Sequence, residues 1–239
     1  MKLAPWLAFL HKWLGLVIGI QIVLWMSGGF VMSFFKIEDV RGEHNIAHQE
    51  TVLMDGADLR IPLANAINAY APQGVRSVTF KSFMGQTVYD LHRSDNSHVL
   101  IDTRSGGLVV IDEVRVRALA EADFAGEGSI AELALMEDTN SEYRGSVPVW
   151  RVRFDDREDT RLYFNVETGR TVARRNGTWR LYDFFWMLHI MDYEDRENFN
   201  NWWLVVMSAS ALFIVLLGFG LMFYRLRLRD WRVMFAKKR

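Results

Sequence analysis

Two charge-free apolar segments decide the architecture of this 239-residue chain. The first is Trp13–Phe35, WLGLVIGIQIVLWMSGGFVMSFF, and the second is Trp202–Tyr224, WWLVVMSASALFIVLLGFGLMFY. Each has 23 residues, and a helix of about 20 apolar residues crosses the hydrocarbon core of a bilayer. The first segment is longer than the core of a signal peptide and ends without a small-residue cleavage site. The sequence therefore predicts two retained transmembrane helices.

The distribution of charge predicts how these helices are oriented. Nine of the 28 basic residues lie at the two ends of the chain, whereas the segment between them carries 19 basic and 28 acidic residues. Positively charged flanks stay in the cytoplasm. We therefore expect a protein of the bacterial inner membrane, with both termini cytoplasmic and the central domain periplasmic. The acidic centre argues against nucleic acid as a partner, and the basic tail is explained by topology and lipid headgroups.

The composition and motifs restrict the chemistry that the chain can perform. There is no cysteine, which excludes disulfides, thiolate nucleophiles and iron–sulfur ligands. The sequence also contains no glycine-rich phosphate loop, zinc-protease helix motif or evident nucleophile–base arrangement. These observations favour a role in binding over an enzymatic one.

The central segment contains a repeated pattern of alternating strands and glycine turns. Residues 88–92 and 101–107, followed by a strand over Leu108–Ile111, correspond to residues 149–153 and 164–170, followed by a strand over Thr171–Arg174. A periodic helix precedes each copy. We expect six regions: a transmembrane helix (1–36), two repeats (37–113 and 114–177), an interfacial amphipathic helix with a charged turn (178–200), a second transmembrane helix (201–225) and a basic cytoplasmic tail (226–239).

Four short motifs resemble those of a known family. Leu10–Leu16 (LHKWLGL) and Trp25–Gly29 (WMSGG) in the first helix, Glu38–His44 after it, and Leu188–Tyr193 before the last helix are similar to PepSY-associated transmembrane proteins. The two repeats resemble PepSY domains. The resemblance implies a membrane α+β fold in which two transmembrane helices flank a periplasmic domain of two PepSY-like helix–β-meander repeats.

The resemblance also implies two kinds of function. PepSY domains act as peptidase-inhibiting or protein-binding modules, which predicts an accessory or regulatory subunit of a membrane complex that handles redox reactions or metals. Larger members resemble haem-carrying ferric-siderophore reductases, which usually have three or four spans. The alternative is therefore a haem b protein in electron transfer or ferric reduction, and this is the one enzymatic activity that we consider.

The histidines are the candidate ligands for haem or a metal ion. The predicted helices place His11 on the cytoplasmic side and His189 on the outer side, and the run from His11 to the outer end at Phe35 spans roughly 36 Å at 1.5 Å per residue. The two therefore cannot ligate one iron. His44 and His189 are candidate outer haem ligands, with His11 as an inner ligand completed by a second copy. If Glu43–Gln49 is helical, His44 and His48 share a face and form a candidate metal site.

Small and polar residues in the first apolar segment predict contacts between helices. Gly15 and Gly19 form a GxxxG motif, and Gln21 is a lone polar side chain among apolar neighbours. Small residues allow close approach of helices within the pair or with a partner. The expected partners are membrane lipid and either another membrane protein or a second copy of the chain.

Overall fold

The computed structural model describes residues 3–48 and 56–225 and divides the chain into two compact units. One unit, here called the helical unit, contains the chain up to Phe35 and from Leu181 onward. The other, the β-rich unit, contains Lys36–Arg180. The basic tail expected at 226–239 lies outside the described residues.

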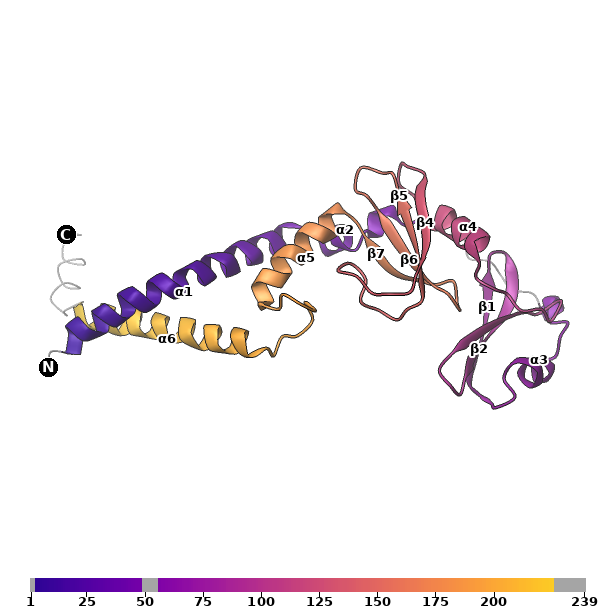
Figure 1. Cartoon of the computed structure of the whole chain (residues 1–239), viewed down its shortest axis with the longest axis horizontal. Coiled ribbons are helices and arrows are strands. Elements are labelled where there is room, and N and C mark those ends of the chain that lie inside the picture. Colours follow the sequence, from indigo (N-terminus) through magenta and orange to yellow (C-terminus); the bar gives the residue numbers. More distant parts are fainter. Residues whose placement is uncertain (1–2, 49–55, 226–239) are drawn as a thin grey trace, which may run out of the picture. The chain divides into compact units, whose positions relative to one another are not determined.

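The helical unit consists of two long helices and most of a third (Figure 1). Helix α1 spans Leu3–Phe34, α5 spans Gly177–Ile190 and α6 spans Trp202–Arg225. Two segments, Ala8–Phe34 and Trp202–Phe223, are long and apolar enough to cross a membrane. In the most apolar 18-residue stretch of each, only 17% and 6%, respectively, is buried. Helices in the core of a soluble protein would be covered by other elements. The two apolar helices are confirmed, and their exposed surfaces suit membrane anchoring.

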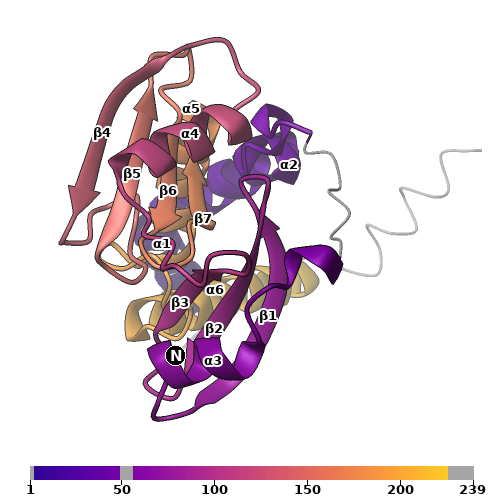
Figure 2. The same ribbon diagram turned by 90° about the vertical axis from the view of Figure 1, so that its right-hand side faces the viewer.

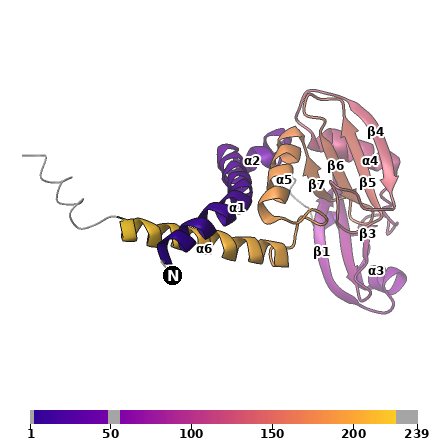
Figure 3. The same cartoon turned by 60° about the vertical axis from the view of Figure 1, so that its left-hand side comes forward.

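Helices α1 and α6 contact one another within the helical unit (Figure 3). Ile18 of α1 and Ile214 of α6 are buried, whereas most of their apolar neighbours are exposed. Each helix therefore uses a narrow stripe for the contact and leaves the rest of its apolar surface for lipid.

The β-rich unit contains two antiparallel sheets, each preceded by a helix (Figure 2). After the short helices α2 (Ile37–Val40), η1 (Glu43–Asn45) and η2 (Gly56–Asp58), the first repeat has α3 (Leu63–Tyr70) and strands β1 (Val75–Phe83), β2 (Gln86–Arg93) and β3 (His98–Asp102). The second repeat has α4 (Glu113–Asp123) and strands β4 (Ile130–Met136), β5 (Val149–Phe154), β6 (Arg161–Asn165) and β7 (Thr171–Arg175). The strand orders are β1-β2-β3 and β4-β5-β6-β7.

The structure corrects the strand assignment of the first repeat. The strand expected over Leu108–Ile111 is absent, and this segment makes a single bridge between Leu108 and Ile101. Conversely, β1 and β4 were not expected. A change of register interrupts the pairing of each of them, at Val75/Ser77 and at Ile130/Glu132. Such bulges break the simple alternation by which strands are recognised.

The two repeats share one hydrophobic core. On one side of the first sheet, Tyr89 and Leu91 pack with residues of α3. On its other side, Val88 and Leu100 join a second cluster with α4 and the second sheet, which contributes Leu162. Successive residues of a strand point to opposite faces, so β2 is covered on both faces. The β-rich unit therefore behaves as one folded body.

Polar contacts fix the ends of the elements in this unit. The Asp112 side chain accepts a hydrogen bond of 2.9 Å from the backbone N–H of Arg115 and thus caps α4. Buried Asn176 accepts from the N–H of Trp179 at the start of α5 and donates to the Asp39 carbonyl at 2.9 Å. This one side chain therefore connects α5 to the segment that contains α2.

Candidate functional site

His189 lies where α5 meets α1 in the helical unit. A Cβ placed on Gly28 would come within 3.5 Å of the His189 side chain, so the absence of a side chain at Gly28 makes room for the imidazole. The Trp25 indole N–H donates a 2.9 Å hydrogen bond to the His189 carbonyl. The Nδ1 atom of His189 is buried and has no hydrogen-bond partner among the described residues. The WMSGG motif thus supplies both contacts that hold His189.

His11, near the other end of α1, is also packed against a glycine of a neighbouring helix. Its ring lies against Gly218 of α6, where an added Cβ would come within 3.1 Å of the imidazole. The His11 Nδ1 atom is also buried without a partner in the described structure. His11 and Gly28, the contact of His189, are 17 positions apart on one helix, about 25 Å at 1.5 Å per residue. One chain therefore does not bring His11 and His189 to a common iron.

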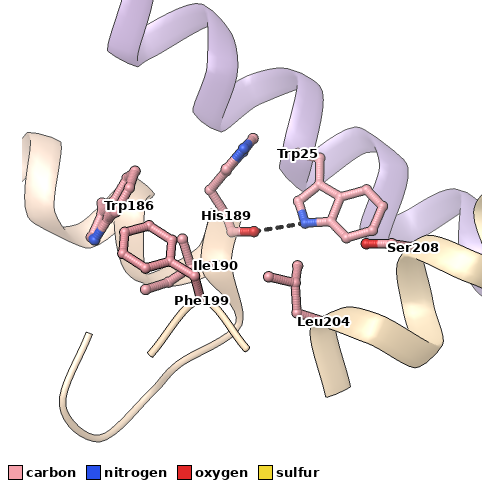
Figure 4. A pocket seen from close by; sticks show the side chains of 7 residues that line it. All are labelled: Trp25, Trp186, His189, Ile190, Phe199, Leu204 and Ser208. Carbon is pink, nitrogen blue, oxygen red and sulfur yellow. Dashed lines mark hydrogen bonds between the residues drawn. The ribbon is translucent and has the colours of Figure 1, made fainter. Parts of the chain in front are cut away.

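A pocket of about 460 Å³ adjoins His189 (Figure 4). Trp25 comes from α1, Trp186 comes from α5, and Leu204 and Ser208 come from α6. The remaining lining residues are His189, Ile190 and Phe199. The pocket is mostly apolar, with polar atoms from only a few groups, as is typical of sites for small organic molecules. Sequence reasoning singled out His189 but missed the aromatic residues, because they come from three separate segments.

The predicted packing residues of α1 have different outcomes. Gln21 is buried, and its Nε2 lies 3.5 Å from the Leu188 carbonyl oxygen, so it lies at the contact with α5. Gly15 and Gly19 have nothing within 4 Å of an added Cβ among the described residues. The close glycine contacts of α1 and α6 are made instead at Gly28 and Gly218. The GxxxG face therefore takes no part in packing within the helical unit.

His44 lies between two carboxylates in the β-rich unit. Its Nε2 is 3.5 Å from Oε2 of Glu158, and its Nδ1 is 3.9 Å from Oδ1 of Asp39. Oε2 of Glu158 is buried and makes no hydrogen bond within the described residues. His44 therefore lies close enough to pair electrostatically with both acidic side chains when it is protonated. Glu158 was not expected near His44, since 114 positions separate them.

The condition for a shared face of His44 and His48, a helix over Glu43–Gln49, is not met in the part that the structure describes. Helix η1 ends at Asn45, and Ile46 is extended, with φ −89° and ψ 121°. Ile46 bridges to Phe124, and the Ala47 N–H donates to the Asp123 carbonyl, so the chain pairs with the end of α4 instead of continuing as a helix. His44 and His48 consequently do not share a helical face. Across the described residues, no three His, Asp or Glu side chains are arranged to hold a metal ion.

A second histidine cluster, which the sequence did not indicate, lies on the first sheet. Asp90 accepts hydrogen bonds from Lys81 at 2.7 Å and from His98 Nδ1 at 2.8 Å. Burial by itself would raise the pKa of Asp90, but Lys81 and His98 outweigh burial and lower that pKa. The His92 ring stacks on His98 with centroids 4.5 Å apart. His92 and His98 are both half-buried, and their rings contact one another.

The outer edges of the two sheets differ in character. Strand β1 carries Arg76 and Lys81, charged residues that discourage pairing with a further strand. Strand β4 has the sequence IAELALM, with one charge, Glu132, that is paired with Arg151 of β5. Its Leu135 is 45% exposed. Within the described structure no strand pairs with the outer side of β4, which lies at the margin of the second sheet (Figure 2).

A scan against protein-family models matched no family, and neither a search of curated proteins nor a search of solved structures found a significant match.

Proposed function

We propose that this chain is an accessory or regulatory subunit of a membrane complex that handles redox reactions or metals. Its two helices anchor it in the bacterial inner membrane, and the β-rich unit, two PepSY-like repeats in the periplasm, binds a partner protein. The observation that carries this proposal is the open edge of β4. An exposed strand with few charges and no proline offers unpaired N–H and C=O groups on which an extended segment of a partner can add a strand.

The character of β4 supports recognition at this edge. Strand β1, the corresponding edge of the first repeat, carries two cationic side chains. On β4, the only charge is Glu132, which is engaged by Arg151, while Leu135 supplies exposed apolar surface. Main-chain pairing supplies affinity in such complexes, and alternate side chains supply specificity. A partner with an extended apolar segment suits this surface.

A matched pair of substitutions tests the proposal. Leu135→Lys places a charge on the β4 edge, whereas Val172→Lys places the same charge on β7, the opposite edge of the same sheet. Both native side chains are 45% exposed. After affinity purification from native membranes, we expect the wild type and Val172→Lys to retain a stoichiometric partner and Leu135→Lys to lose it. Loss with Val172→Lys alone would reject β4 as the recognition edge.

The alternative function is that of a haem b protein in electron transfer or reduction of ferric siderophores. The buried, unpartnered Nδ1 atoms of His11 and His189 favour it, because buried imidazoles without partners are unusual except at functional sites. Haem would supply one-electron chemistry, with imidazole as an axial ligand. About 25 Å of α1 separates His11 from Gly28, the residue that His189 contacts. Each histidine would therefore need a second axial ligand from elsewhere, such as another copy.

A spectrum distinguishes this alternative. The protein is purified in mild detergent, and a reduced-minus-oxidised difference spectrum is recorded. A haem b protein shows a Soret and an α band at a substantial haem-to-protein ratio, and His189→Ala abolishes the signal of the outer haem. Protein without these bands would exclude the alternative.

A further inference from the structure

Two histidines lie directly opposite one another on the first sheet. His92 of β2 and His98 of β3 are register partners in the antiparallel pairing of these strands. Side chains of opposite residues project from the same face of a sheet, with their Cβ atoms about 4.5–5.5 Å apart. The two imidazole rings stack with centroids 4.5 Å apart and an angle of 5° between their planes. The backbone pairing therefore holds the two imidazoles side by side.

Asp90 determines which nitrogen of His98 can act as a ligand. Its Oδ1 lies 2.8 Å from His98 Nδ1, and its Oδ2 lies 2.7 Å from Lys81 Nζ. Burial would raise the pKa of Asp90, but the hydrogen bonds from Lys81 and His98 outweigh burial and lower that pKa. The carboxylate is therefore ionised near pH 7 and can only accept hydrogen bonds. Nδ1 of His98 carries the proton, and the neutral imidazole has its lone pair on Nε2.

This arrangement around His98 is typical of histidines that bind metal ions. A ligating imidazole commonly donates its second N–H to a carboxylate, which fixes the orientation of the ring and increases the basicity of the ligating nitrogen. Asp90 supplies that carboxylate to His98. Because its other oxygen is occupied by Lys81, Asp90 is an outer partner of the imidazole and not a ligand itself.

The second imidazole is accessible and has no competing contact. Within the described structure, neither ring nitrogen of His92 has a hydrogen-bond partner. His92 is half-buried and the His98 side chain is 32% exposed, so ions in solution can reach both rings. Two metal–nitrogen bonds of about 2.0–2.1 Å bridge nitrogens about 4 Å apart, which is close to the separation of the rings. A small rotation of the rings about their Cβ–Cγ bonds brings one nitrogen of each to a common ion.

The charges around the two histidines favour a cation. Oε2 of Glu167, in the turn between β6 and β7, accepts a 2.8 Å hydrogen bond from the backbone N–H of His98. Glu167 and Asp90 thus place two negative charges beside the rings, and the positive charge of Lys81 is paired with Asp90. Arg93, the next residue of β2, projects from the opposite face of the sheet. A divalent ion at the imidazoles would therefore meet a favourable local field.

We propose that His92 and His98 together bind a divalent transition-metal ion, with water completing its coordination. Imidazole nitrogen suits Cu²⁺, Ni²⁺ and Zn²⁺, whereas Mg²⁺ and Ca²⁺ prefer oxygen ligands, and Cu²⁺ has the highest affinity of the series. Across the described residues, no third His, Asp or Glu is arranged with this pair to hold the ion. The site is therefore open to exchange, unlike a closed structural site with four protein ligands. The inference does not depend on recognition at β4, which belongs to the second sheet.

Titration of the full-length protein in mild detergent with Cu²⁺ tests the proposal, with glycine present as a weak competing chelator. We expect saturable binding and an electron paramagnetic resonance spectrum that shows coupling to two imidazole nitrogens. His92→Ala and His98→Ala each leave a single ligand. Each should raise the dissociation constant by at least about 10-fold, since loss of even an outer partner of a ligand typically costs about 10- to 100-fold in metal affinity. His48→Ala is the matched control, because it removes an exposed imidazole outside the pair, and it should bind as the wild type does.

Three results would overturn the proposal. A wild-type titration that matches that of the double variant His92→Ala/His98→Ala would show that the pair binds no ion. An equal loss of affinity in His48→Ala and His92→Ala would indicate adventitious binding by accessible imidazoles. An unchanged dissociation constant in His92→Ala would show that the two rings do not act together. Because His92 has no hydrogen bond to lose within the described structure, its variant tests the proposal even if His98→Ala disturbs the sheet. Retention of a partner protein reports on β4 separately, so failure of one proposal is distinguishable from failure of the other.

Discussion

Gly28 of α1 lies directly against His189 of α5: a methyl group on Gly28 would meet Nδ1 of His189 at 3.5 Å and the Phe185 carbonyl oxygen at 3.3 Å. The neighbouring Gly29 has nothing within 4 Å among the described residues. Two adjacent glycines of one apolar helix therefore have different surroundings. Close packing between membrane helices depends on small residues at the point of contact, and here that residue is Gly28.

Substitution of these glycines tests the contact. Gly28→Val forces a branched side chain between α1 and α5 and should lower stability by about 1–3 kcal/mol, the usual cost of overpacking. Gly29→Val changes the same helix by the same chemistry but meets no neighbour, so the thermal midpoint in detergent should stay close to that of the wild type. An equal decrease for both variants would show that intrinsic helix effects, and not the contact with His189, determine the result.

A second glycine pair tests the contact between the two repeats. A Cβ on Gly169 would lie 2.8 Å from the Phe83 ring, whereas one on Gly85 meets nothing within 4 Å among the described residues. Both have positive φ, +64° and +77°, so alanine at either position pays about 1–2 kcal/mol for a left-handed conformation. Gly169→Ala should cost more, by about 1–3 kcal/mol of overpacking.

Hydrogen exchange locates the additional cost. We expect Gly169→Ala to accelerate amide exchange in peptides of both β1 and the β6–β7 turn, because the contact joins the repeats. Gly85→Ala should accelerate exchange only around the β1–β2 turn. Repeats that respond independently to Gly169→Ala would contradict a shared core.

The β-rich unit contains a partly buried ion cluster whose contribution to stability depends on pH. Oε1 of Glu142 accepts hydrogen bonds of 2.8 Å from Arg161 and from Arg180. Burial alone would raise the pKa of Glu142, but the two guanidinium groups outweigh burial and hold the pKa below its usual value. A carboxyl with a lowered pKa in the folded state stabilises the protein above its unfolded pKa. That stabilisation is lost as the pH falls through the lowered value.

Glu142→Gln should therefore destabilise the protein near pH 7, by about 2–3 kcal/mol for a broken, mostly buried pair. The difference from wild type should shrink in acid as the wild-type carboxyl takes up a proton. Glu132→Gln, which removes an exposed partner of Arg151, is the matched control and should change stability by less than about 1 kcal/mol. Denaturant titrations at several pH values measure both, and a pH-independent effect of Glu142→Gln would refute the role of its charge.

The absence of cysteine makes the predicted topology simple to test. Ser94 is exposed in the β2–β3 turn, and Lys238 belongs to the basic tail. In intact cells, a membrane-impermeant maleimide should label Ser94→Cys and leave Lys238→Cys unlabelled until the membrane is permeabilised. The reverse pattern would place the β-rich unit in the cytoplasm.

Hydropathy and alternation along the sequence predicted those helices and strands whose formation depends mainly on neighbouring residues. The apolar helices and the strands at 88–92, 149–153 and 171–174 were recognised by hydropathy and alternation, and they correspond to α1, α6, β2, β5 and β7. Strands β1 and β4 were missed because bulges interrupt their pairing, and the strand at Leu108–Ile111 was expected from a pattern that the fold uses for a single bridge. Pairing partners, which decide such cases, are not encoded in neighbouring residues.

For the candidate sites too, the spacing of residues predicted only part of the observed contacts. The spacing of Gly15 and Gly19 predicted a packing face, but the glycines that contact other helices are Gly28 and Gly218. The spacing of His44 and His48 would give a shared face only in a helix, and pairing of Ile46 with Phe124 ends the short helix before His48. Which small or polar residue meets a neighbour is set by the approach of distant segments, as for His44 and Glu158.

Site-specific photo-crosslinking in living cells probes the proposed binding of a partner protein at the edge of β4. A photoreactive benzoyl-phenylalanine is placed at Leu135 of β4 or at the equally exposed Val172 of β7. We predict a discrete crosslink to one other protein from position 135 and none from position 172. A crosslink from position 172 alone, or no crosslink from position 135, would contradict recognition at β4.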